Sequence, residues 1–103
     1  MSKNDTKKVQ TDADVKKKAV KMVITHLKKK IGQPYVGKQN MDDWIIEMET
    51  LLSKQEFDIG EYFEMRKKLN DIIERTIDEE MRYKLRDSWY SLGKALDKKV
   101  KHK

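Results

Sequence analysis

The chain has 103 residues, a net charge of +6, and more charged residues (41%) than hydrophobic ones (37%). This length allows one domain with a small core, and the absence of cysteine excludes disulfides and thiolate metal sites. No apolar run exceeds three residues, so the sequence predicts neither a membrane-spanning helix nor a signal peptide. We therefore expect a soluble, cytoplasmic protein.

Charge is sorted along the chain. Residues 1–40 carry 11 Lys against 3 Asp, residues 41–93 carry 8 Lys and Arg against 14 Asp and Glu, and residues 94–103 carry 5 Lys against 1 Asp. An acidic middle between two lysine-rich ends favours a binding protein over an enzyme. Lysine occurs 20 times and arginine 4 times, a bias that suggests an AT-rich genome such as that of a phage, a plasmid or a low-GC bacterium.

The first forty residues predict a tail followed by a helix. Residues 1–10 show no apolar periodicity, so we expect a disordered basic arm there. Thr11 then opens a capping signature, because its hydroxyl can accept from the backbone N–H of Asp14. Apolar residues follow at helical spacing and predict a helix over about 12–31, which Gly32 would end.

The rest of the chain predicts three more amphipathic helices. The first covers about 41–53 with Asn40 as its N-cap, and the second covers 59–75 after the capping residue Asp58. The last covers about 79–98. Because no Gly or Pro separates the last two, one continuous helix of about 40 residues is the structural alternative.

Four short amphipathic helices predict an all-α fold, a small four-helix bundle over 11–99 with a basic tail over 100–103. The longest apolar stripes predict the centre of the core, which we place at Leu69, Ile73, Leu85, Trp89 and Leu92.

The lysine clusters are the feature that folding explains least, because like charges at i,i+4 cost helix stability. The simplest interpretation is a solvated surface, and the functional one is a site for phosphate or anionic lipid. Lysine binds phosphate as a point charge, so we expect nucleic-acid binding with low sequence selectivity. The predicted nucleic-acid-binding residues are Lys16, Lys17, Lys18, Lys21, Lys28, Lys29, Lys30, Lys98, Lys99, Lys101 and Lys103.

Two tyrosines are candidate partner contacts. Tyr83 and Tyr90 flank the apolar stripe of the last predicted helix, where they would rim a protein interface or stack on bases. Catalysis is not predicted, because the chain has no phosphate-binding glycine loop and no nucleophile motif. His26 and His102 have no convergent ligands at suitable spacing, so neither a metal nor another cofactor is predicted.

These features favour a small, non-enzymatic regulatory protein that docks on a larger protein or nucleoprotein complex, with its lysine-rich ends on nucleic acid. In size, charge and helix count the chain is also similar to the immunity proteins of pediocin-like bacteriocins. That resemblance implies a first helix near an anionic membrane and recognition of a toxin–receptor complex. A structural homo-oligomer, such as a homodimer with a seam formed by the last two helices, is the third hypothesis.

Overall fold

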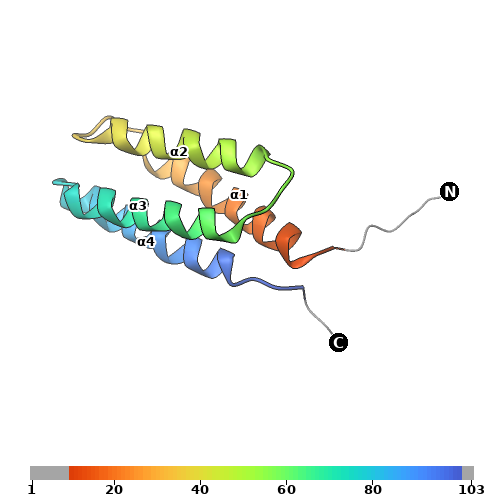
Figure 1. The fold of residues 1–103 in the computed structure, drawn as a ribbon. Helices are drawn as coiled ribbons and strands as arrows, with labels where there is room; N and C mark the ends of the chain where they lie inside the picture. Colours follow the sequence, from red (N-terminus) through yellow and green to blue (C-terminus); the bar gives the residue numbers. More distant parts are fainter. Residues whose placement is uncertain (1–9, 101–103) are drawn as a thin grey trace.

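The computed structural model describes residues 10–100, which form four α-helices and no strand (Figure 1). The helices are α1 (Asp12–Lys30), α2 (Lys38–Ser53), α3 (Ile59–Arg75) and α4 (Glu79–Leu96). The prediction of an all-α fold with separate third and fourth helices is confirmed. Apart from Gln10 and Val100, the predicted basic arm and basic tail lie outside the described residues.

Successive helices run in opposite directions (Figure 1). α1 packs chiefly against α4, α3 lies between α4 and α2, and α1 makes its loosest contact with α2. We group the helices into two pairs, which we call the α1–α4 layer and the α2–α3 layer, and the packing of α3 against α4 joins them. The first and last helices of the chain are neighbours along their length, which brings the lysine-rich segments of the sequence together.

Local capping explains where α1 and α4 begin. The Thr11 hydroxyl accepts from the Asp14 backbone N–H at 3.1 Å, and the Asp14 carboxylate accepts from the Thr11 backbone N–H at 3.1 Å. α4 begins after Asp78, whose carboxylate accepts from the backbone N–H of Met81 at 2.8 Å. α3 ends at Arg75 because Thr76 takes an extended conformation. These caps divide α3 from α4 without a glycine or proline.

The predicted start of α2 at Met41, with Asn40 as N-cap, is wrong. The helix begins at Lys38, and its N-cap is Gly37, which has φ of 93°. Only glycine adopts this left-handed conformation without steric cost, so Gly37 turns the chain directly into the helix. Asn40 consequently lies inside the first turn.

α3 begins after its predicted capping residue, Asp58. Asp58 accepts from the backbone N–H of Gly60 at 2.9 Å, while the Glu61 carboxylate pairs with Lys54 at 3.3 Å. Phe57 and Tyr62 pack together across this start, with the two rings stacked at 4.9 Å between centroids.

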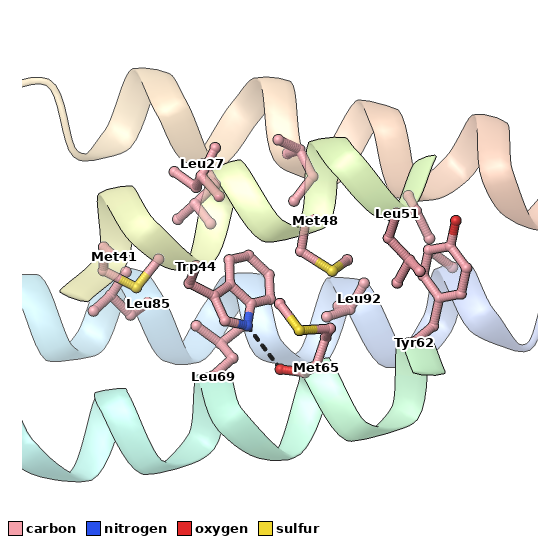
Figure 2. Packing of buried hydrophobic residues seen from close by; sticks show 14 of the residues in the cluster. Leu27, Met41, Trp44, Met48, Leu51, Tyr62, Met65, Leu69, Leu85 and Leu92 are labelled. Carbon is pink, nitrogen blue, oxygen red and sulfur yellow. Dashed lines mark hydrogen bonds between the residues drawn. The ribbon is translucent and has the colours of Figure 1, made fainter. Parts of the chain in front are cut away.

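The core runs the length of the bundle between the two layers (Figure 2). Trp44 is its largest buried side chain, and its indole N–H donates to the Met65 carbonyl at 2.8 Å. Four of the five predicted core residues are buried: Leu69, Ile73, Leu85 and Leu92. Trp89 is only partly buried, because Ser88 takes the core-facing position and the guanidinium of Arg66 covers the Trp89 ring at 3.8 Å.

Candidate functional site

The charge zones of the sequence become two differently charged layers. Residues 10–30 and 79–100, which form the α1–α4 layer, hold 13 Lys and Arg against 6 Asp and Glu, a net charge of +7. Residues 38–75, which form the α2–α3 layer, hold 6 Lys and Arg against 10 Asp and Glu, a net charge of −4. An anionic partner is therefore attracted to one side of the bundle and repelled by the other.

Three contacts join α1 to α4 and to the segment after it. The buried Lys16 ammonium donates to the Lys98 carbonyl at 2.5 Å, and the Val100 backbone N–H donates to the Asp12 carboxylate at 2.8 Å. At the other end of α1, Lys30 pairs with Asp87 at 2.6 Å. The first contact brings two lysines that are 82 residues apart in sequence to the same end of the bundle.

A groove follows the seam between α1 and α4. One hollow of about 510 Å³ is lined by residues that include Val15, Lys18, Ala19, Met22, Lys98 and Lys99. A second hollow of about 520 Å³ is lined by residues that include Met22, Val23, His26, Lys29, Lys30 and Asp87. Because Met22 lines both hollows, we treat them as one site, the α1–α4 groove.

The groove gathers four of the predicted lysines as exposed cations. These four are Lys18, Lys29, Lys98 and Lys99. None of them forms an ion pair within residues 10–100. Lys94, which sequence reasoning did not select, is a fifth exposed cation beside the groove, close enough to Asp87 to influence its ionisation. We call these five residues the groove lysines. Their shared surface is the arrangement best suited to a polyanion.

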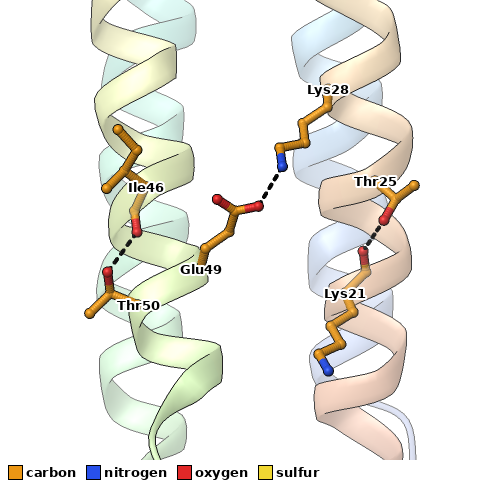
Figure 3. Close-up of polar contacts among 6 residues, drawn as sticks. All are labelled: Lys21, Thr25, Lys28, Ile46, Glu49 and Thr50. Atoms are coloured by element: carbon orange, nitrogen blue, oxygen red, sulfur yellow. Dashed lines mark hydrogen bonds and ion pairs between the residues drawn. The ribbon is translucent and has the colours of Figure 1, made fainter.

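The other predicted lysines are used or placed differently. Lys16, which is 8% exposed, is held by the Lys98 carbonyl, and Lys17 donates to the Lys54 carbonyl at 2.6 Å. Lys28 pairs across to Glu49 of α2 at 2.5 Å, and Lys21 lies on the same α1–α2 side of the bundle (Figure 3). Lys101 and Lys103 lie outside the described residues.

Asp87 is the one carboxylate among the described residues that line the groove. The hydrogen bond and positive charge of Lys30, with a further contribution from Lys94, lower the pKa of the Asp87 carboxyl below its usual value. Asp87 therefore stays ionised at neutral pH. Its negative charge is balanced by Lys30, and the net charge of the groove remains positive.

Tyr83 and Tyr90 lie on the outer side of α4, with 80% and 56% of their surface exposed. They are one heptad apart, so the helix carries both on the same side. The Tyr90 ring lies edge-on against Trp89 at 5.1 Å between centroids. Exposed aromatic rings of this size are typical of contact surfaces.

The described residues contain no helix able to cross a membrane. They also contain no group of three or more metal-binding side chains placed to hold an ion. Comparison of the chain with family models, curated proteins and solved structures found no match. The geometry of the α1–α4 groove is therefore the basis for a functional proposal.

Proposed function

We propose that this chain is a non-catalytic binding protein whose α1–α4 groove holds the phosphate backbone of a nucleic acid with low sequence selectivity. The observation that carries the proposal is the convergence of the groove lysines, which come from α1, α4 and the segment after α4. Lys16 and Lys30 show that this fold can use lysine in internal contacts, whereas the groove lysines have no carboxylate partner among residues 10–100.

Lysine suits this role because an ammonium group attracts phosphate without the fixed fork that arginine offers to guanine. Binding then depends mainly on the release of counterions from the nucleic acid, which makes it weakly selective and strongly dependent on salt. Five phosphate contacts predict a log–log salt slope near −4.5 on duplex DNA and about −3.5 on a single strand.

The acidic α2–α3 layer gives the complex its orientation. Its net charge of −4 turns it away from phosphate, so it faces outward when the groove is occupied. We propose that this layer meets a larger protein or nucleoprotein complex, which makes the chain a regulatory adaptor. The alternative near an anionic membrane is less well supported, because the free cations border a concave seam and not a projecting apolar surface.

The test is the salt dependence of binding to a fluorescent 20-base-pair duplex and to a 20-nucleotide strand. Replacing Lys98 and Lys99 with glutamine should weaken binding to both and make the duplex slope less negative by about 1.8. The matched control is the double substitution of Lys67 and Lys68, adjacent lysines of α3 that pair at the surface with Glu64 and Glu47.

The control should leave the slope unchanged, because its lysines lie on the α2–α3 layer. Equal losses in the two double variants would contradict a localised groove site. Absence of binding to either nucleic acid at about 50 mM salt would contradict the proposed function, particularly if the chain binds anionic vesicles in the same buffer. Sedimentation in this buffer would reveal the homo-oligomer of the third hypothesis.

A further inference from the structure

The floor of the α1–α4 groove is apolar between its charged ends. Val15, Ala19, Met22 and Val23 line it, and Met22 is 57% exposed. Phosphate gains nothing from such a floor, and a duplex keeps the apolar faces of its bases stacked inside. A strand with unpaired bases can instead place phosphates on the lysines and bases on the apolar surface.

Two exposed aromatic rings lie on the outer side of α4, next to the groove but not in the lining of its hollows. Tyr83, Asp87, Tyr90 and Lys94 follow one another at intervals of four, three and four residues, so they form one row along the helix. Asp87 is the member of this row that lines the groove, and each tyrosine lies one helical turn from Asp87. The two tyrosines are about 10 Å apart along the helix axis, with their rings exposed on either side of Asp87.

Tyr90 is held in place before any ligand binds. Its ring contacts Trp89 at an interplanar angle of 73°, and Trp89 is itself covered by Arg66. A ring already fixed by its neighbours loses little rotational freedom when a base stacks on it. Arg86 lies between the two tyrosines on α4, is exposed, and has no ion pair within the described residues. Its planar guanidinium can stack on a base as well as attract phosphate.

We propose that the ligand of the α1–α4 groove is single-stranded nucleic acid, with Tyr83 and Tyr90 stacking on unpaired bases while the groove lysines hold the phosphates. The inference rests on the proposed function and goes beyond it by naming the form of nucleic acid. It also assigns separate tasks to the two kinds of residue, because lysine controls the salt slope and tyrosine controls affinity at every salt concentration.

The experiment compares oligo(dT)20 with a 20-base-pair duplex at equal salt by fluorescence anisotropy. We expect the strand to bind at least about ten times more tightly than the duplex. Replacing Tyr83 and Tyr90 with alanine should weaken strand binding by about 5- to 150-fold per tyrosine without changing the salt slope. Replacing both with phenylalanine should keep affinity within about twofold, because the stacking ring remains.

Phe63 provides the matched control, since it is an exposed aromatic residue of α3, in the acidic α2–α3 layer away from the groove lysines. Phe63→Ala should leave strand affinity unchanged, and thermal melts should show that the tyrosine variants fold, because both tyrosines are exposed. Equal binding of strand and duplex, together with no effect of the tyrosine-to-alanine change, would overturn the inference while the lysine variants could still support the proposed function.

Two other outcomes would also overturn the inference. If oligo-glutamate of matched charge displaces oligo(dT)20 at equal concentration, the groove recognises charge alone. If neither nucleic acid binds at low salt, the inference fails together with the proposed function. The lysine and tyrosine variants therefore separate the failure of one from the failure of both.

Discussion

Gly93 lies inside α4, where alanine would ordinarily stabilise a helix by about 1 kcal/mol. A methyl carbon at this position would lie 2.4 Å from Nη2 of Arg66 and 2.7 Å from its Cζ, well inside van der Waals contact. Arg66 occupies this space because its guanidinium stacks on Trp89 and its Nε donates to the Trp89 carbonyl at 3.3 Å. Glycine is therefore the residue that lets Arg66 lie flat on α4.

Gly93→Ala should displace the guanidinium and cancel the normal benefit of alanine. The displaced group loses a cation–π contact of about 0.5–1 kcal/mol and a hydrogen bond of about 0.5–1.5 kcal/mol. Set against a gain of about 1 kcal/mol in helix propensity, the change should leave stability unaltered or reduce it by up to about 1.5 kcal/mol. In an Arg66→Ala background the same substitution should stabilise by about 1 kcal/mol, because nothing then fills the space.

The assay is urea unfolding of the four proteins of this double-mutant cycle, followed by circular dichroism. The coupling between Gly93 and Arg66 should be about 1–2.5 kcal/mol. If alanine stabilises both backgrounds equally, within about 0.5 kcal/mol, Arg66 does not occupy the position described and the account of Trp89 is wrong.

Two buried hydroxyls give further predictions. The hydroxyl of Tyr62 has no hydrogen-bond partner within the described structure. Tyr62→Phe should therefore raise the free energy of unfolding by about 1 kcal/mol. A loss of stability would instead show that the hydroxyl has a partner. Burial, aided by the charge of Asp42, raises the pKa of Tyr35 to about 12. The folded chain then keeps a phenol proton that the unfolded chain releases near pH 10, so stability should fall between about pH 10 and 12. Tyr35→Phe should remove this part of the pH dependence, which absorbance at 295 nm and denaturant titrations can measure.

The helices were predictable because their ends are set by neighbouring residues. Thr11 and Asp78 each accept from a backbone N–H three residues later, and such local capping patterns can be recognised in the sequence. The start of α2 could not be predicted in the same way, because both Gly37 and Asn40 are acceptable N-caps and only the backbone conformation distinguishes them. Trp89 was misplaced because a contact from another helix, with Arg66, decides its environment.

The candidate site was predictable as a surplus of charge but not as a set of residues. The Lys16 ammonium finds its acceptor 82 positions away, and Lys30 finds its carboxylate 57 positions away. No local pattern shows which lysines such contacts will occupy. Lys94 was overlooked for the same reason, since it is a single lysine in sequence and joins the others only when α4 lies against α1.

The contacts that hold Lys16 and Lys30 against α4 and the segment after it also bring the groove lysines close to one another. Lys16 and Lys30 tie α1 to α4 near the two ends of the seam, and the groove lysines lie along and beside the groove that runs between them. Cations without partners on one side of a small bundle repel one another, and this repulsion disfavours the folded state. Such a cost is typical of residues kept for binding and not for stability. On the proposed function, a polyanion in the groove would relieve this repulsion, so binding would stabilise the folded chain.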